Sequence, residues 1–415
     1  MTGSKESFIS NFKAPENSRG LRSQGDQYLV DLPVPGRRSE RWKYSPISKL
    51  LNTSLNTCSG EGVVWPEEIL PDPVPFLDSY RLVFRNGHYV SSLSDMPIDD
   101  DVICMPLSEV GAEFTNDYHK REWVGAMNAA YHQDGLFLKV SKNVSLDRPV
   151  VIHHLTDGAD IAALPRHYIE LEEGAGAEVV VWSSASEKSS GMCNGILEAN
   201  VSSNAYLRVD KICNEAGEIF KFSHEYIKQE RDSRVKINTF TIKGHWVRNE
   251  LEIVANGPGT DSTFNGAYLP TGTEHVDNHT VMDHAYPNGT SSELYRGIMY
   301  DKSTGVFNGK VFVRKDAQQT NAFQQNSNIV ADKGATINAK PELEIYADDV
   351  KCSHGCTVGQ FDKEALFYLK SRGIGSDEAK ALLVKAYVGD VISSVDREEV
   401  RNEILRLYSE RHGWA

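Results

Sequence analysis

The sequence has no long apolar run, no excess of basic residues and no amino-terminal secretion signal. No run approaches the roughly 20 apolar residues that span a bilayer. The first thirty residues contain no apolar signal core with a cleavage site. We therefore expect a cytoplasmic protein without a membrane partner. The formal net charge of −14 argues against a nonspecific nucleic-acid binder, because the phosphate backbone repels an acidic surface.

Cysteine is also sparse. Six cysteines are scattered over 415 residues without a CxxC pair. This spacing argues against a disulfide framework and excludes a closed zinc site of the CxxC…CxxC kind. The chain also lacks a P-loop, a GxGxxG dinucleotide fingerprint and a GxSxG nucleophile elbow. If the protein depends on nucleotide energy, a partner must supply it.

Three regions differ in their residue pattern. Residues 1–75 are polar and irregular with helical pieces, and the proline-rich run WPEEILPDPVP at their end predicts a linker. Trp42 and Tyr44, in the segment ERWKY, predict aromatic anchors that hold this region on the rest of the protein. Residues 76–355 are rich in β-forming segments, and residues 356–415 are helical.

The middle region predicts many short strands. Asn86-Gly87 predicts the tight turn of a hairpin, and residues 114–133 are the best helix candidate. Beyond them, to about residue 350, strands recur between Gly, Asn, Asp and Pro, which suits a sandwich, a barrel or a β-solenoid. The dense Asn and Gln of residues 316–328 favour a β-helix, in which amide side chains stack. The alternative is a polar loop between sandwich strands.

The last region predicts three helices. Asp362 can cap the first helix and Gly373 can end it, while Ser376 is the N-cap candidate of the second. Each later helix has an apolar stripe, so we expect the helices to cover the end of the β body, to bind another protein, or both. The stripes are Ala379, Leu382, Leu383, Ala386 and Tyr387 in the second helix, and Val400, Ile404, Leu407 and Tyr408 in the third.

Cys352-Ser353-His354-Gly355-Cys356 is the first candidate for chemistry. Alternate residues of a strand share one face, so Cys352, His354 and Cys356 would point the same way. Thiolate and imidazole are ligands of soft and borderline metals. The alternative is a strand end with a small buried thiol and a hydrogen-bonded histidine, and the spacing identifies no fourth ligand.

Two further groups carry titratable side chains. His275, His279 and His284 lie within ten residues and suggest a metal site, but a polar strand face with exposed imidazoles is the favoured interpretation. Asp348 and Asp349 are paired carboxylates that could act in sugar cleavage on a β-helix. A strand terminus with Asx turns is the favoured interpretation of this pair.

The stretch ELEIYADDVKCSHGCTVGQFDKEALFYLKSRGI resembles the signature of the SufB/SufD family of iron–sulfur cluster assembly proteins. The resemblance continues through NGKVFVRKDAQQTNAFQQNSNIV, HTVMDHAYPNGTSSELYRG and, more weakly, ERWKY, and it covers essentially the whole chain. It is closer to the SufD branch, because Ile345 stands where SufB has a cysteine and His354 where SufB has a glutamate. Cys356 departs from the alanine common in SufD and takes no family role.

The resemblance implies a mainly β fold, with a right-handed parallel β-helix core between N-terminal and C-terminal helical regions. It implies a non-catalytic, SufD-like subunit of the SufBCD complex that pairs with the scaffold SufB through the β core, docks the SufC ATPase on its last helices and assists iron acquisition. His354, with Cys352, is the candidate site for transient iron or a nascent Fe–S cluster at the partner interface, and no cofactor is held stably. The candidate partner-binding residues are Phe367, Tyr368, Leu369, Arg372, Leu382 and Leu383.

Two alternatives from other classes remain open. One is a SufB-like scaffold that works as a homodimer and carries a cluster without SufB. The other is a β-helix polysaccharide enzyme that uses Asp348 and Asp349, against which the lack of a secretion signal counts.

Overall fold

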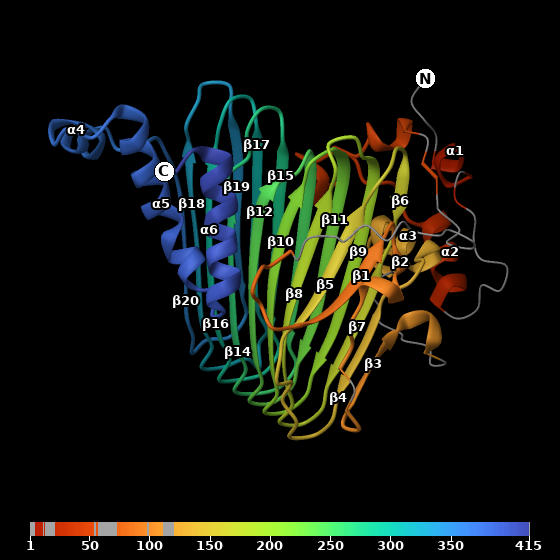
Figure 1. Cartoon of the computed structure of the whole chain (residues 1–415). Coiled ribbons are helices and arrows are strands. Elements are labelled where there is room, and N and C mark those ends of the chain that lie inside the picture. Colours follow the sequence, from red (N-terminus) through yellow and green to blue (C-terminus); the bar gives the residue numbers. More distant parts are fainter. Residues whose placement is uncertain are drawn as a thin grey trace.

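The computed structural model describes residues 5–10, 12, 21–53, 55–56, 73–97, 99–110 and 120–414. Its centre is a solenoid of two facing sheets, between which the chain alternates (Figure 1). Neighbouring strands are parallel except for the antiparallel pairs β1–β2 and β3–β4. The parallel β-helix core with helical regions at both ends is confirmed, and the sandwich and barrel alternatives are wrong.

Each sheet has a fixed strand order. Sheet I contains β2 (His88–Tyr89), β1 (Tyr80–Arg85), β5 (Val150–Thr156), β8 (Gly176–Ala185), β10 (Tyr206–Glu215), β12 (Arg234–Lys243), β14 (Asp261–Tyr268), β16 (Thr290–Met299), β18 (Asn321–Val330) and β20 (Lys351–Gly359). Sheet II contains β19 (Thr336–Ile345), β17 (Thr304–Val313), β15 (His275–His284), β13 (Trp246–Ala255), β11 (Glu218–Gln229), β9 (Ser190–Val201), β7 (Arg166–Leu171), β4 (Leu136–Val140) and β3 (Val102–Pro106), with β6 (Ile161–Ala163) beside β9.

The predicted hairpin and the predicted boundary of the β body can be compared with these strands. The hairpin is confirmed, because β1 and β2 flank Asn86 and Gly87, whose φ angles are 50° and 86°. β20 extends to Gly359, past the predicted domain boundary between residues 355 and 356.

One corner of the solenoid repeats the same backbone conformation in successive turns. Its residues have a positive φ angle, which Asn, Asp and Gly tolerate best. The backbone N–H of each corner residue donates to a carbonyl in the next turn. That carbonyl belongs to the residue directly before the next corner residue. Thus Asn204 N–H donates to Arg231 O and Asp232 N–H to Pro258 O, both at 3.0 Å. The corner residues are Asn143, Gly174, Asn204, Asp232, Gly259, Asn288 and Gln319.

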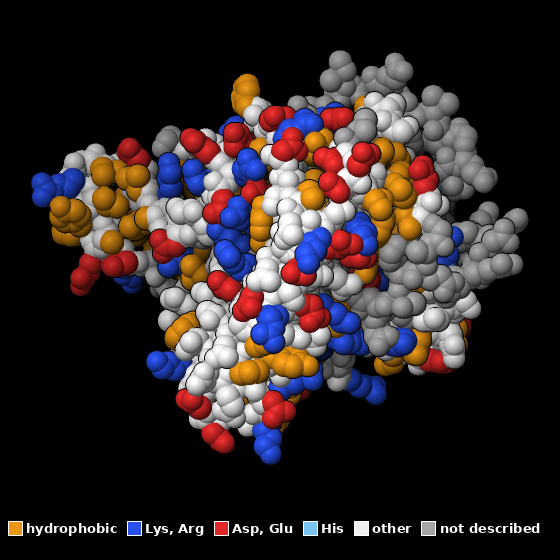
Figure 2. Space-filling view, turned by 90° about the horizontal axis from the view of Figure 1, so that it is seen from below, with side chains coloured by type: hydrophobic (Ala, Val, Ile, Leu, Met, Phe, Trp, Pro, Cys, Tyr) orange, Lys and Arg blue, Asp and Glu red, His pale blue; other side chains and the backbone are white. Residues whose placement is uncertain are grey.

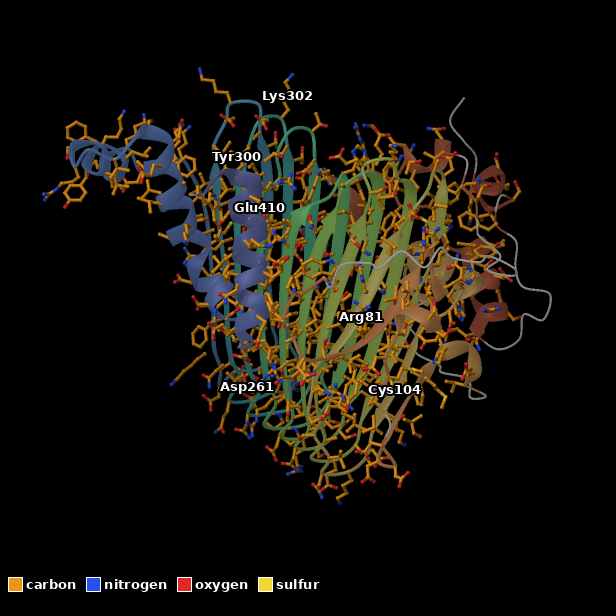
Figure 3. The ribbon with its side chains drawn as sticks, viewed as in Figure 1. Arg81, Cys104, Asp261, Tyr300, Lys302 and Glu410 are labelled. Atoms are coloured by element: carbon orange, nitrogen blue, oxygen red, sulfur yellow. The ribbon has the colours of Figure 1, made fainter. Side chains whose placement is uncertain are left out.

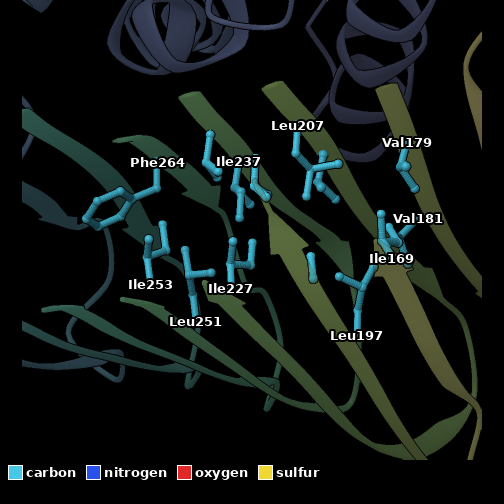
Figure 4. Close-up of a cluster of buried hydrophobic side chains, with 14 of the residues drawn as sticks. Ile169, Val179, Val181, Leu197, Leu207, Ile227, Ile237, Leu251, Ile253 and Phe264 are labelled. Atoms are coloured by element: carbon cyan, nitrogen blue, oxygen red, sulfur yellow. The ribbon is translucent and has the colours of Figure 1, made fainter. Parts of the chain in front are cut away.

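Alternate side chains of both sheets fill the interior of the solenoid. Figure 4 shows Leu207, Ile237 and Phe264 of sheet I opposite Leu251 and Ile253 of sheet II. All five are almost completely buried, and such burial contributes about 25 cal/mol for each Å² of apolar surface. The strand register therefore stacks apolar side chains from one turn to the next and holds the two sheets together.

The N-terminal region covers the outer face of sheet II. Trp42 is buried there, with its ring 6.2 Å from that of Phe222 and under the guanidinium of Arg248, which confirms its predicted role as an anchor. Tyr44 is exposed. The helices of this layer are α1 (Lys5–Ile9), α2 (Leu21–Asp31), α3 (Trp123–Tyr131) and the short 3-10 turns at Glu40–Trp42, Leu50–Asn52, Ser91–Leu93 and Leu107–Glu109.

Two sequence predictions fall partly outside the described residues. The predicted helix at 114–133 is shorter in its described part, because α3 begins only at Trp123, and residues 114–119 are not described. Of the predicted linker, residues 65–72 are likewise outside the described ranges.

The last helices cover the outer face of sheet I. Val388 of α5 and Ile404 of α6 share a buried cluster with Phe240 of β12. Tyr300, labelled in Figure 3, stacks on His412 at the end of α6, with ring centroids 5.4 Å apart. The helices therefore cover a face of the solenoid, which corrects the expectation that they cover its end. The helices are α4 (Lys363–Ser371), α5 (Ser376–Ser393) and α6 (Glu398–His412).

The caps follow the predictions in part. Asp362 Oδ1 accepts two backbone N–H groups of α4 at 2.8 and 3.1 Å, and Gly373 has a φ angle of 87°. Ser376 is not an N-cap: Gly375 occupies that position without a side-chain hydrogen bond.

α5 buries a different face from the predicted stripe. The helix is apolar on several sides, and packing against sheet I selects its valine side. Leu382 and Ala386 of the predicted stripe are exposed. The predicted stripe of α6 is buried as expected. The buried residues of α5 are Ala379, Val384, Val388, Val391 and Ile392.

Candidate site at the open end of the solenoid

The solenoid ends at β19 and β20, which are the last strands of sheets II and I. The predicted Cys-x-His-x-Cys segment lies on β20. Its three side chains are in register with the buried residues of β18, since Cys352 pairs with Ala322 and His354 with Gln324. They therefore share the inner face of the sheet, as predicted. His354 and Cys356 are exposed because no described strand covers this end.

The backbone of β20 also presents unused hydrogen-bonding groups. Lys351 N–H donates to Thr320 O of the preceding turn at 2.8 Å. Because backbone groups alternate in direction along a parallel strand, those of Cys352, His354 and Cys356 point to the free edge. Directly after β19, Tyr346 N–H donates inward to Val313 O at 2.9 Å. The same alternation places Pro341 at an edge position, where a missing N–H breaks no bond within the sheet.

The two thiols of β20 lie in different surroundings. Cys352 is half-buried and packs against the interior cluster. Cys356 is exposed, and its thiol donates weakly to Asn326 Oδ1 at 3.9 Å. Burial raises the pKa of both thiols, so metal binding has to displace a proton from each. Across the described ranges, no three His, Cys, Asp or Glu side chains lie close enough to hold a metal by themselves.

The column of inward-facing side chains in register with His354 turns polar beside this end. Glu293 is fully buried on β16, and burial raises its pKa to about 7. Its carboxylate accepts the Thr280 hydroxyl at 2.6 Å and the Gln324 side-chain N–H at 2.8 Å. The register places Phe264 on one side of Glu293 and Gln324 on the other. Glu293 and Gln324 were missed at the sequence level, because only the register brings them beside His354.

The second histidine group is divided between two faces of β15. His279 contacts Asp277 at 3.0 Å on the outer face, and His275 shares a hydrogen bond of 2.8 Å with the Ser45 hydroxyl. His284 lies on the inner face, where burial lowers its pKa to about 4. These histidines are not a metal site. They are largely buried and hydrogen-bonded, which also corrects the expectation of exposed imidazoles.

Asp348 and Asp349 lie in the turn between β19 and β20. Both are exposed. The backbone of Asp349 joins the repeating corner: its N–H donates to Gln318 Oε1 at 2.9 Å, and its carbonyl accepts Gln319 N–H at 2.6 Å. The pair fits the interpretation as a strand terminus.

Three of the six predicted partner-binding residues lie on α4, which projects from the body (Figure 1). Arg372 is the C-cap of this helix, and the other two residues lie on α5. No residue of α4 is buried. Phe367 is 75% exposed, Tyr368 57% and Leu382 of α5 43%. Leu369 and Leu383 are half-buried. The projecting part carries orange apolar side chains at the left of Figure 2.

In the part of the chain that the structure describes, no helix combines the length and apolar character that crossing a bilayer requires.

These features define a class of proteins: a parallel β-helix with helical regions at both ends, whose last described strands, β19 and β20, form an uncovered end. A model of the SufBD core domain of the SUF system for FeS cluster assembly matches residues 154–387, and a model of the SufBD N-terminal region matches residues 8–152. The chain therefore belongs to the SufB/SufD family of iron–sulfur cluster assembly proteins.

Curated relatives narrow the comparison to the SufD branch. The chain is 30% identical to the iron–sulfur cluster assembly protein SufD of Escherichia coli, over 96% of this chain and 95% of that protein. It is 27% identical to a SufBD family protein of Synechocystis, over 92% and 88%. It is 26% identical to SufD of Bacillus subtilis, over 97% and 95%. The chain is SufD-like within this family.

Proposed function

We propose that the protein is a SufD-type subunit that pairs with a SufB-type scaffold through the open end of the solenoid. The observation that carries this proposal is the free edge of β20, where His354 and its neighbours are exposed on a strand whose outward backbone groups are unused. An exposed sheet edge is a template for pairing with another chain. A partner strand would continue the ladder and cover the side chains. Such a complex would act in the cytoplasm.

Within that interface, His354, with Cys352, holds iron or a nascent cluster transiently, as cargo. A neutral imidazole binds iron near pH 7, and a thiolate adds a soft donor. Two side chains supply only two ligands, fewer than the four of a typical tetrahedral N/S site, so they cannot complete a coordination shell alone. The SufB-type partner would supply the remaining ligands.

The exposed surface of α4 and α5 docks a SufC-type ATPase. Phe367, Tyr368 and Leu382 offer apolar area there, whereas the opposite side of α5 is fixed to sheet I. Arg296 links β16 of the solenoid to α5, because it donates to Tyr387 O and to Asp390 of α5, each at 2.8 Å. Movement of the ATPase would reach the solenoid through this contact.

The proposal is tested by His354→Ala in the reconstituted complex of the three proteins. Ser353→Ala is the matched control, because Ser353 lies on the same strand but on the other face. We expect lower iron content and slower cluster assembly for His354→Ala, and no change for the control. Equal assembly by both variants contradicts the role of His354.

The free edge also permits a second candidate function as a homodimeric scaffold. Two copies could pair edge to edge around a twofold axis. Anaerobic reconstitution of the chain alone separates the two functions, because a scaffold forms a cluster absorption band without SufB, whereas a SufD-type subunit does not.

A further inference from the structure

A column of polar side chains runs inside the solenoid to its open end. The register of sheet I pairs Glu293 with Gln324, and Gln324 with His354, in three successive turns. Earlier turns of the same column contain Ile237 and Phe264. Polar groups in an interior cost free energy unless they are hydrogen-bonded, so this change of character needs a physical reason.

The buried carboxylate fixes the orientation of the Gln324 amide. Glu293 accepts two hydrogen bonds, from the Thr280 hydroxyl at 2.6 Å and from Gln324 Nε2 at 2.8 Å. Above its pKa of about 7, Glu293 is a carboxylate that cannot donate, so the amide nitrogen of Gln324 must then face Glu293. The amide oxygen then faces the opposite side, toward the turn that carries His354.

That oxygen has no partner of its own. Gln324 is 2% exposed, and its Oε1 is buried without a hydrogen bond among the described residues. The opposite wall leaves space for the amide at this level, because a Cβ at Gly309 would lie 2.3 Å from Gln324 Nε2. An unpaired buried acceptor costs about 1–3 kcal/mol, which a donor on the next strand can remove.

We propose that Gln324 is a positioning residue for His354: its Oε1 accepts one ring N–H of His354 and leaves the other ring nitrogen free for metal, while Glu293 holds the amide in place. This inference rests on the proposed function of His354. Histidine ligands are commonly oriented through the hydrogen bond of their other nitrogen. Here the Glu293 carboxylate would orient His354 indirectly, through the side-chain amide of Gln324.

The first test is Co²⁺ binding by the full chain at pH 8, followed by visible absorption. We expect Gln324→Leu to weaken Co²⁺ binding about tenfold or more, and to have no effect in a His354→Ala background. The exchanged pair Glu293→Gln with Gln324→Glu restores a donor facing an acceptor, so it should recover most of the affinity. Far-UV circular dichroism and the denaturation midpoint verify that each variant is folded.

The outcomes separate the two levels of the proposal. If His354→Ala and the natural chain bind Co²⁺ alike, the metal role of His354 fails, and this inference fails with it. If His354→Ala weakens binding but Gln324→Leu does not, only the positioning role fails.

A second measurement does not depend on metal. The ring ¹⁵N signals of His354, identified by their loss in His354→Ala, should shift in Gln324→Leu because the hydrogen bond is gone. Unchanged ring signals overturn the inference.

Discussion

The two ends of the solenoid are built differently. At the first end, sheet I finishes with the antiparallel pair β1–β2 and sheet II with the antiparallel pair β3–β4. At the other end, β19 and β20 are parallel edge strands, and His354 and Cys356 are exposed on β20. Edge strands invite association unless they are blocked. This difference is the observation on which the proposed partner interface at the second end rests.

The column of inward-facing side chains that ends at His354 also differs between the two ends. Toward the first end, the column that ends at His354 contains Val209, Ile237 and Phe264, and beside the open end it contains Glu293 and Gln324. Apolar stacking supplies stability in the first part. The polar part contributes less to stability, and its hydrogen bonds point toward the exposed side chains.

The largest loss of unfolding free energy should come from a substitution in the apolar part of this column. Phe264→Ala removes a buried ring and should lower the free energy of unfolding by about 3–5 kcal/mol. Phe323→Ala is the matched control, because Phe323 is exposed on the outer face of β18, and it should change that free energy by less than about 0.5 kcal/mol. Urea denaturation measures both. Equal losses of unfolding free energy in the two variants would contradict the claim that Phe264 stabilises the interior and Phe323 does not.

The next largest effect is the pH dependence of stability that arises from Glu293, the buried acid in the polar part of the column. Burial raises the pKa of Glu293 from 4.5 to about 7, so the folded state favours the protonated form. This contribution is complete below pH 4.5 and is lost as pH rises through 7. At about 1.4 kcal/mol for each pH unit, the loss is roughly 3 kcal/mol. Glu293→Gln should remove this part of the pH dependence of unfolding; an unchanged pH profile would contradict it.

A smaller loss of unfolding free energy is expected from a substitution at the free edge of β20. The N–H of Val358 points away from β18, so Val358→Pro should cost less than about 1 kcal/mol of unfolding free energy. It removes an edge donor and should weaken binding of the SufB-type partner at least about tenfold. Thr357→Pro is the contrasting variant, because the Thr357 N–H points into the sheet and its loss should destabilise the fold. Calorimetric titration measures the affinity, and full binding by Val358→Pro would argue against edge pairing.

The smallest effect on stability is expected on α4. Phe367 is 75% exposed, so Phe367→Asp should change the free energy of unfolding by less than about 0.5 kcal/mol. The same change should reduce binding of the SufC-type ATPase, because it places a charge in the apolar surface. Lys370→Ala on the same helix also lowers the net charge by one unit and controls for the charge change. If the ATPase binds both variants as it binds the natural chain, its docking site lies elsewhere.

The sequence predicted the kind of fold better than its dimensions. Strand-forming runs between turn residues indicated the β body, and Asp362 and Gly373 marked α4 correctly. The repeat length was missed, although Asn204, Asp232 and Asn288 mark equivalent corners, because the strands between them differ in length and polarity. Packing then decided which face of α5 is buried, since several of its faces are apolar.

The candidate site was predictable only along the strand. Alternation places Cys352, His354 and Cys356 on one face, and the structure confirms that placement. Their neighbours across the sheet, Gln324 and Glu293, depend on register, which no local pattern in the sequence fixes. Histidine spacing misled for a different reason: positions 279 and 284 are an odd number of residues apart on one strand, so alternation places them on opposite faces of β15.

Hydrogen–deuterium exchange of the full chain, with and without a SufB-type partner, tests the central claim most directly. We predict that the amides of β20, which include those of Cys352, His354 and Cys356, become protected on binding, while those of β2 at the other end exchange unchanged. Protection of β2 without protection of β20 would contradict the assignment of the open end as the partner interface.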